Sequence, residues 1–293
     1  MPPVPSSPLR NRPFKQVDVF TTTPYRGNPL AVVLDGAGLD DEAMQRFARW
    51  TNLSETTFLL PPTQAEADYR VRIFTPGGEL PFAGHPTLGS CHAWLESGGT
   101  PRHTGVVVQE CKVGLVRIRR EPTRLAFAAP ALKLTAPSAA LLDKVAGALG
   151  LQPQDIVASQ LLDNGPVWLG LLLDSPETVL RLRPDHGSLK ALGQKVGVAA
   201  RYLQADIAAP TSPSLEVRAF AAPIGIEEDP VTGSLNASLA HWLMEQGHVP
   251  ASYVAAQGSC VDRCGRVFIA RDDAQQIWVG GESVTCITGQ VRL

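Results

Sequence analysis

The chain has 293 residues, of which 44% are hydrophobic and 18% charged, enough apolar material for the cores of two domains. A formal net charge of −2 and a sequence pI near 6.3 exclude a bulk electrostatic attraction to nucleic acid or to an anionic membrane. No apolar stretch follows the first basic residues, so we expect neither a signal peptide nor a membrane anchor, but a flexible tail over residues 1–13 of a cytoplasmic protein.

The first half predicts a β-hairpin, a helix and further strands, in that order. Residues 14–20 and 28–35 are rich in β-branched residues on either side of a polar turn, which is typical of a hairpin. Segment 40–51 has acidic residues in its first turn and apolar residues at helical spacing, Trp50 among them, and predicts an amphipathic helix. Further strands are predicted at 56–62, 68–76 and 105–120.

A fragment of the first half recurs half a chain later. Val71 and Val217 each open the sequence Val-Arg-X-Phe, which is followed by a turn and then by a helix rich in small residues. We expect these helices to begin near Pro86 and Pro230 and to be closely packed on all sides. The repeat predicts an α+β fold of two pseudo-symmetric halves, each a mostly antiparallel β-roll around a buried helix. A cleft between two such halves is a preferred place for a small-molecule site.

The second half repeats the order of the first. We predict strands at 164–174, 215–220 and 255–272 and a helix at 184–197. The Pro- and Ala-rich segment 129–143 is expected to be the linker. The predicted domains are therefore 14–128 and 129–293, the second including the linker and a last strand that can cross back to the first domain.

The cysteines are expected to be free thiols, because they form an odd set of five in a long chain without an export signal. Cys260 and Cys264 have no second Cys or His pair nearby, which argues against a zinc site. No His-Glu-X-X-His sequence or similar spacing occurs, so no metal site is predicted.

Several long motifs give the chain a family resemblance. The sequences GNPLAVV, NLSETTF, RIFTPGGELPFAGHPTLG and EEDPVTGS follow one another in the order found in the phenazine-biosynthesis isomerase-like (PhzF) family, which the chain resembles from Phe14 to its end. That family is similar in fold to diaminopimelate epimerase and proline racemase. The resemblance implies an active site between two β-rolls, a homodimer, a small carboxylate substrate, and no cofactor.

Glu55, in NLSETTF, directly follows the predicted amphipathic helix. A carboxylate at a strand entrance beside Ser54 and the apolar Phe58 can lose solvent, which raises its pKa towards the range used in acid–base catalysis. An exposed loop glutamate is the simpler interpretation of the residue alone. The resemblance implies that Glu55 removes a proton from carbon and returns it elsewhere, with Ser54 beside the substrate.

His85 follows Gly84 at the mouth of the first buried helix. The helix N-terminus favours an anionic group, and Gly84 lets the backbone come close to it. The resemblance assigns His85 to the active site. Asp229 precedes Pro230 much as His85 precedes Pro86, so we expect the two side chains to meet across the cleft. The alternative is that Asp229 only caps its helix.

Further residues are candidates for substrate binding. Gly233 and Ser234 offer backbone N–H groups and a hydroxyl to a carboxylate. Asn28 lines the cleft or serves only its turn. Gln257 and Arg263 form a second group, in which Arg263 orients a carboxylate or lies on the surface of a hairpin.

Racemases of the wider fold use two thiols, one from each half. The nearest counterparts here are Ala83 and Pro230, which cannot move a proton, and Cys91 lies two helical turns further on. A two-thiol racemase is therefore disfavoured.

The leading hypothesis is an isomerase that shifts a proton, and with it a double bond, on a small cyclic or unsaturated carboxylic acid. Glu55, His85 and Asp229 carry the chemistry in this interpretation. The alternatives are an amino-acid epimerase or racemase that uses these carboxylates, and a small-molecule-binding protein without turnover.

Overall fold

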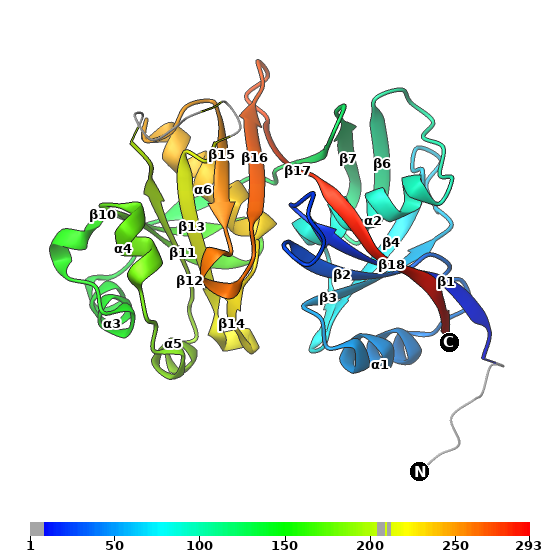
Figure 1. The fold of residues 1–293 in the computed structure, drawn as a ribbon, viewed down its shortest axis with the longest axis horizontal. Coiled ribbons are helices and arrows are strands. Elements are labelled where there is room, and N and C mark those ends of the chain that lie inside the picture. Colours follow the sequence, from blue (N-terminus) through cyan, green and yellow to red (C-terminus); the bar gives the residue numbers. More distant parts are fainter. Residues whose placement is uncertain (1–8, 204–208, 210–211) are drawn as a thin grey trace, which may run out of the picture.

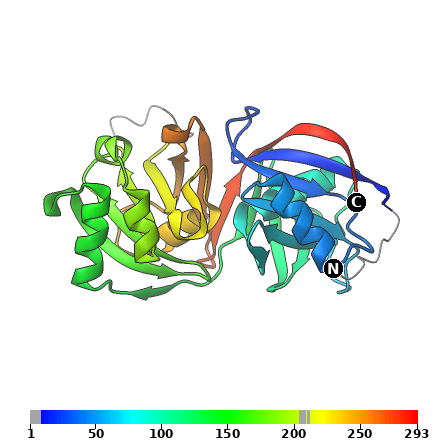
Figure 2. The ribbon, with the colours of Figure 1, turned by 90° about the horizontal axis from the view of Figure 1, so that it is seen from below.

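Two lobes lie side by side and share one continuous sheet. The computed structural model describes residues 9–203, 209 and 212–293, which form six α-helices and an 18-stranded sheet. Figures 1 and 2 show the N-terminal half of the chain in one lobe and most of the C-terminal half in the other. No helix within the described ranges combines the length and apolar character that a membrane crossing needs.

The elements of the first lobe, in chain order, are β1 (Asn11–Val19), β2 (Asn28–Val33), α1 (Asp41–Thr51), β3 (Glu55–Leu60), β4 (Tyr69–Thr75), β5 (Gly78–Leu80), α2 (Gly84–Glu96), β6 (Val106–Cys111), β7 (Gly114–Arg120) and β8 (Leu125–Ala128). Those that follow are β9 (Lys133–Thr135), α3 (Ala139–Leu149), β10 (Ile156–Asp163), β11 (Val167–Leu173), α4 (Pro176–Arg181), α5 (His186–Leu192), β12 (Lys195–Arg201), β13 (Leu215–Ala221), β14 (Ile226–Asp229), α6 (Gly233–Glu245), β15 (Ser252–Gln257), β16 (Gly265–Arg271), β17 (Ile277–Gly281) and β18 (Ser283–Arg292).

The two lobes repeat one pattern of strand pairing. In the first, β2 is antiparallel to β1 and parallel to β3, while β4 is antiparallel to β3 and β5 and parallel to β6. In the second, β11 is antiparallel to β10 and parallel to β12, while β13 is antiparallel to β12 and β14 and parallel to β15. The predicted α+β fold of two pseudo-symmetric, mostly antiparallel halves is confirmed.

An arginine–glutamate pair is also duplicated. Arg72, from the first Val-Arg-X-Phe fragment, donates from Nε and Nη2 to the two carboxylate oxygens of Glu79, at 2.7 and 2.9 Å. Arg218, from the second fragment, donates in the same way to Glu228, at 3.0 and 2.8 Å. Each pair ties the strand of the fragment to the short strand that leads into the buried helix, so it fixes the approach to that helix in both halves.

The helices α2 and α6 are buried along most of their length because small residues let the sheet approach them. A Cβ added to Gly89 of α2 would lie 2.6 Å from the Leu30 Cδ2 and 2.8 Å from the Val19 Cγ2, so a larger residue there would force these side chains to move. The predicted starts near Pro86 and Pro230 are off by a few residues, since α2 already begins at Gly84 and α6 only at Gly233.

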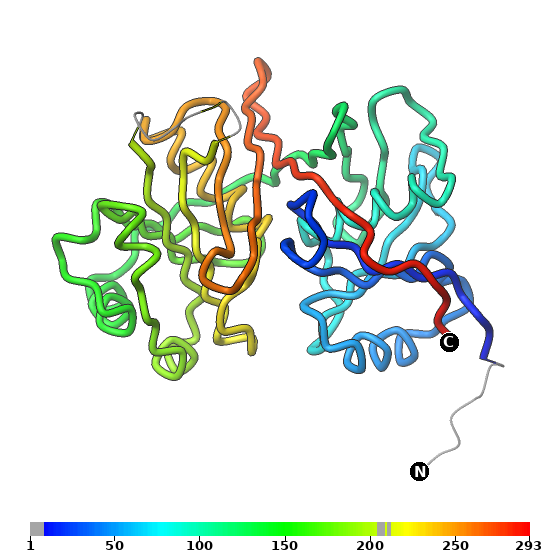
Figure 3. Tube along the Cα trace, in the orientation of Figure 1, coloured from blue at the N-terminus to red at the C-terminus, as the bar shows by residue number. Residues whose placement is uncertain are grey.

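Two strands cross between the lobes. β17 pairs with β8, and β18 then pairs along the whole of β1, so the end of the chain returns to the first lobe. In Figure 3 the red trace of β18 runs over the blue trace of β1. Boundaries at 14–128 and 129–293 remain our proposal for the domains.

The predicted tail and linker need correction. Residues 1–8 lie outside the described part of the chain, but Asn11 to Pro13 belong to β1, because they pair with the end of β18. The segment 129–143 is more than a linker: it contains β9, which pairs with β10, and the first residues of α3, which begins after the N-cap Ser138.

Two predicted helical features were wrong in part. Trp50 is 78% exposed, because its ring only stacks on that of the buried Phe47, with ring centres 6.0 Å apart, and does not itself enter the core. The helix predicted at 184–197 ends at Leu192, since Gly193 takes a left-handed conformation, and Lys195 begins strand β12.

Candidate active site

The N-termini of the two buried helices touch each other. A Cβ added to Gly84 would lie 3.2 Å from the Gly233 Cα, and one added to Gly233 would lie 3.1 Å from the Gly84 Cα. A side chain at either position would press on the facing backbone, so the two glycines favour the close approach. Two sets of free helix N–H groups therefore converge on one region between the lobes, which favours negative charge there.

Glu55 and His85 form a close pair beside this contact. Glu55 is the first residue of β3 and His85 is the second residue of α2. The Glu55 Oε2 lies 3.4 Å from the His85 Nε2, and the two side chains keep only 14% and 6% of their exposure. Within the described residues neither atom has a hydrogen-bond partner, although both are buried. Such unsatisfied buried atoms are rare and mark a place where a ligand can bind.

Asp229 of the second lobe is hydrogen-bonded to Asn28 of the first lobe. The fully buried Asn28 donates from Nδ2 to the Asp229 Oδ1 at 3.0 Å and to the Val231 carbonyl at 2.8 Å. Ser54 in turn donates from Oγ to the Asn28 Oδ1 at 3.4 Å. Asp229 ends β14, and its other carboxylate oxygen accepts from the Thr232 hydroxyl at 2.6 Å. The amide of Asn28 therefore joins the two halves next to Glu55.

Gln257 holds the turn that carries Asp229. Its Nε2 donates to the Asp229 carbonyl at 3.0 Å and to the Thr232 hydroxyl at 2.9 Å. Its Oε1 accepts from the Thr232 backbone at 3.0 Å and from the Asn236 Nδ2 at 2.8 Å. Sequence analysis did not single out Asn236. The only signal for it is its place as the fourth residue of α6, since the fourth residue of α2, Thr87, likewise bonds to a buried glutamine.

Burial raises the pKa values of the Glu55 and Asp229 carboxyl groups to different extents. Burial, and next the charge of Asp229, raise the pKa of Glu55 from 4.5 to about 8 against a hydrogen bond from Ser54. Burial raises the pKa of Asp229 to about 6, while its hydrogen bonds with Thr232 and Asn28 oppose the rise. Burial also lowers the pKa of His85 well below its ordinary value. At neutral pH Glu55 therefore holds its proton, Asp229 is mostly ionised and His85 is neutral.

Among the described residues, no hydrogen bond or ion pair joins the Ser234 side chain to Glu55, His85 or Asp229. It is the second residue of α6, so its counterpart in α2 is His85, and the symmetry expected between His85 and Asp229 was wrong. The Ser234 Oγ accepts from the Trp168 Nε1 at 3.3 Å, within the second lobe. A role for Ser234 in binding stays a prediction.

Arg263 is held by its own loop. Its Nη1 donates to the Val261 carbonyl at 3.1 Å and to the Asp262 carbonyl at 3.4 Å, which is the hairpin alternative of the sequence analysis. All five cysteines are free; Cys260 and Cys264 of the same segment are exposed.

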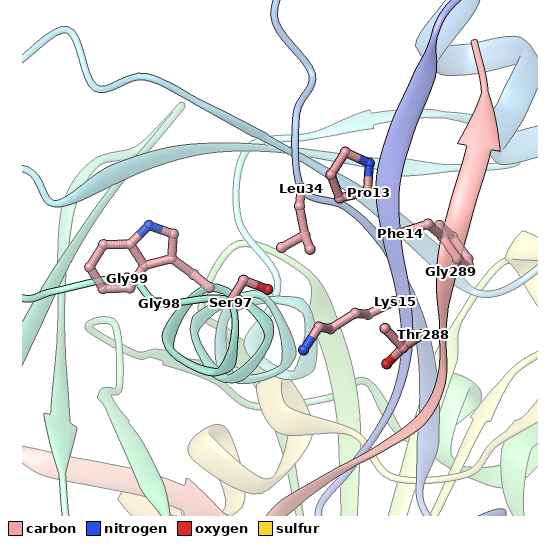
Figure 4. A pocket seen from close by; sticks show the side chains of 10 residues that line it. Pro13, Phe14, Lys15, Leu34, Ser97, Gly98, Gly99, Thr288 and Gly289 are labelled. Carbon is pink, nitrogen blue, oxygen red and sulfur yellow. The ribbon is translucent and has the colours of Figure 1, made fainter.

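A hollow of about 590 Å³ lies on the first lobe, away from Glu55. Figure 4 shows Lys15 of β1, Thr288 of β18 and Leu34 around it, with the end of α2 at one side. None of the predicted site residues lines this hollow. Glu55 and His85 of the predicted site, by contrast, are almost completely buried.

Comparisons with known proteins agree on one family. A sequence model of the family described as "Phenazine biosynthesis-like protein" matches residues 17–289. The chain is 37% identical over 295 residues to "Antisense-enhancing sequence 1" of Schizosaccharomyces pombe, covering 94% of this chain and 97% of that protein. It is 32% identical over 276 residues to "Trans-2,3-dihydro-3-hydroxyanthranilate isomerase" of Pseudomonas aeruginosa, covering 92% of each.

A solved structure has the same fold. The Bacillus anthracis "phenazine biosynthesis protein, PhzF family" superposes with a TM-score of 0.81 at 24% identity, covering 97% of this chain and all of that one. At this identity the likeness concerns the fold alone.

Proposed function

The chain belongs to the phenazine biosynthesis-like (PhzF) family and is an isomerase, and from that premise we propose that it moves a proton, and with it a double bond, on a small cyclic or unsaturated carboxylic acid. Glu55 carries the proton in this proposal. The observation that supports it most is the buried contact between the Glu55 Oε2 and the His85 Nε2, two atoms that lack another hydrogen-bond partner among the described residues.

One carboxyl group can perform both proton transfers. Glu55 starts protonated at neutral pH and gives its proton to one carbon of the double bond. This leaves positive charge on the other carbon of the double bond. The Glu55 carboxylate then takes a proton from the carbon next to that charged carbon, and the electron pair of that C–H bond forms the new double bond. Glu55 ends protonated, as it began, so the cycle needs no other proton source. Such acid–base steps contribute about 10²–10⁴-fold to a rate.

The neighbours of Glu55 have separate tasks in this scheme. The ionised Asp229 lies close enough to raise the pKa of Glu55, so it can also stabilise positive charge that develops on the substrate. The neutral His85 can accept a hydrogen bond from the protonated Glu55 and so orient it. The N–H groups at the starts of α2 and α6 favour negative charge at this junction, which suits an acidic substrate.

The decisive experiment replaces Glu55 by glutamine, which keeps the size of the side chain but cannot carry a proton near neutral pH. Candidate acids are incubated in D₂O, starting with trans-2,3-dihydro-3-hydroxyanthranilate, on which the Pseudomonas aeruginosa relative is named to act. NMR follows deuterium incorporation and double-bond position. Exposed Glu66 provides the matched control, Glu66→Gln.

We expect Glu55→Gln to abolish exchange and isomerisation while the affinity for anthranilate, an unreactive cyclic acid, stays within about tenfold, or ~1.4 kcal/mol. Glu66→Gln should behave as the wild type. Full turnover by Glu55→Gln would end the single-carboxylate mechanism and shift the proton transfer to His85 with Asp229. Exchange with inversion at a Cα carbon would instead support the epimerase alternative.

A further inference from the structure

Lys195 has the place in the second half that Glu55 has in the first. Glu55 is the first residue of β3 and lies opposite Leu30 of the parallel strand β2. Lys195 is the first residue of β12 and lies opposite Trp168 of the parallel strand β11. In both halves the next residue lies opposite the phenylalanine of the Val-Arg-X-Phe fragment, so the register of the two sheets agrees.

The surroundings of Lys195 extend this correspondence to the buried helix. The Lys195 Nζ lies 5.2 Å from the centre of the Trp168 ring, a cation–π distance. The Trp168 Nε1 donates to the Oγ of Ser234, the residue equivalent to His85. Because α2 and α6 begin at one contact, the Glu55–His85 pair and the group Lys195–Trp168–Ser234 each include a residue at one of the two helix N-termini that meet there.

Lys195 lacks a counter-charge. Among the residues that the structure describes, no carboxylate lies within 4.0 Å of its ammonium group. Burial lowers the pKa of Lys195, which is the sign of a positive charge held partly away from water. A desolvated charge costs free energy unless it is paired, and an anionic ligand would supply the missing partner.

The side-chain amide of the neighbouring Asn164 has an oxygen atom without a hydrogen-bond donor among the described residues. The Asn164 Nδ2 donates to the Ser234 carbonyl at 2.9 Å, which fixes the orientation of the side chain. The Asn164 Oδ1 is buried and accepts no hydrogen bond from any described residue. Because buried oxygen atoms normally accept a hydrogen bond, this one can accept from an N–H or O–H group of a ligand.

We propose that Lys195 and Asn164 form a substrate-anchoring subsite, in which Lys195 pairs with a carboxylate and the Asn164 Oδ1 accepts from an adjacent amino or hydroxyl group. The inference rests on the proposed function, because the anchored molecule is the acid on which Glu55 acts. It assigns the second half of the junction to recognition and leaves proton transfer to the first. The ligand class is a cyclic or unsaturated carboxylic acid with a hydrogen-bond donor on a neighbouring carbon.

Paired probes that differ in charge test the subsite. Anthranilate has a carboxylate next to an amino group, and anthranilamide is its neutral counterpart of nearly equal shape. Titration calorimetry with each probe is carried out on the wild type, on Lys195→Met and on Lys195→Arg. Lys190→Met, at an exposed lysine of α5, is the matched control. Circular dichroism of each variant establishes that the fold is kept.

The wild type and Lys190→Met should bind anthranilate more tightly than anthranilamide. Lys195→Met should weaken anthranilate about tenfold and leave anthranilamide unchanged, whereas Lys195→Arg should retain most of the preference for the anion. The subsite is overturned if Lys195→Met keeps that preference, or if it weakens both probes equally, since its alkyl chain would then act only by packing on Trp168. It is also overturned if the wild type binds neither probe. Deuterium exchange by Glu55→Gln is a separate readout, so it can fail or succeed independently.

Discussion

Replacing Glu55 by glutamine is expected to stabilise the fold at alkaline pH, although it removes the proposed proton carrier. Burial, and next the charge of Asp229, raise the pKa of the Glu55 carboxyl from 4.5 to about 8 in the folded protein. The folded state thus binds this proton more tightly than the unfolded state, and the wild type loses stability as pH rises between the two values. At about 1.4 kcal/mol per pKa unit the whole shift corresponds to about 5 kcal/mol.

Residual exposure of Glu55 to solvent reduces the expected difference in the free energy of unfolding. The Glu55 side chain keeps 14% exposure, so water screens part of the charge and we expect about 3 kcal/mol at pH 8 and above. Urea unfolding of the wild type, Glu55→Gln and the exposed control Glu66→Gln, from about pH 4 to pH 9, measures the difference. The advantage of Glu55→Gln should grow from near zero at the acid end to a plateau. A difference that stays constant with pH means that Glu55 is ionised in the fold at neutral pH, and its role as an acid then has no basis.

Two further substitutions test the framework of the site. Gly84→Ala should destabilise the protein by about 1–3 kcal/mol and lower turnover, because its Cβ would lie 2.8 Å from the Phe127 Cζ and 3.2 Å from the Gly233 Cα. Gly77→Ala, whose nearest neighbour would lie at an ordinary 3.6 Å, should be nearly neutral in thermal melting. Arg218→Leu should lower the free energy of unfolding in urea by about 3–5 kcal/mol, because it leaves the Glu228 carboxylate buried without its partner. The double variant with Glu228→Leu should recover most of that stability. Equal stability of the single and double variants would contradict this account.

The fold was predictable from the sequence where the pattern is local. Hairpin, amphipathic helix and small-residue helices each leave a periodic or compositional signal, and the repeated Val-Arg-X-Phe fragment supplied the symmetry. The errors occurred where distant segments decide the structure. Asn11 joins β1 because it pairs with Arg292 at the other end of the chain. Lys195 lies in strand β12 and not in the predicted helix, because β12 pairs with both β11 and β13. No local sequence pattern reveals this pairing.

The candidate site was predictable to a smaller extent. Glu55, His85 and Asp229 were named from motifs, and the structure brings them together at the junction of the lobes, although their roles are still proposals. The Gln257 side chain that holds Asp229 is itself held by Asn236, the fourth residue of α6, whose only signal is that the fourth residue of α2 also bonds to a buried glutamine. Ser234 was expected beside the substrate, but its hydroxyl contacts Trp168, and only the three-dimensional register makes it the counterpart of His85.

The unlike chemistry of the two halves bears on the choice between isomerase and racemase. A two-base racemase needs a proton carrier on each face of one carbon, and a duplicated fold supplies two equivalent positions for them. Here the position equivalent to that of Glu55 holds Lys195, and the position equivalent to that of His85 holds Ser234. Burial raises the pKa of the Glu55 carboxyl to about 8, and among the described residues no carboxylate lies within 4.0 Å of the Lys195 ammonium group, whose pKa burial lowers. If Glu55 carries the proton and Lys195 holds the carboxylate, as we propose, this asymmetry favours transfer between two carbons on a single face of an anchored acid.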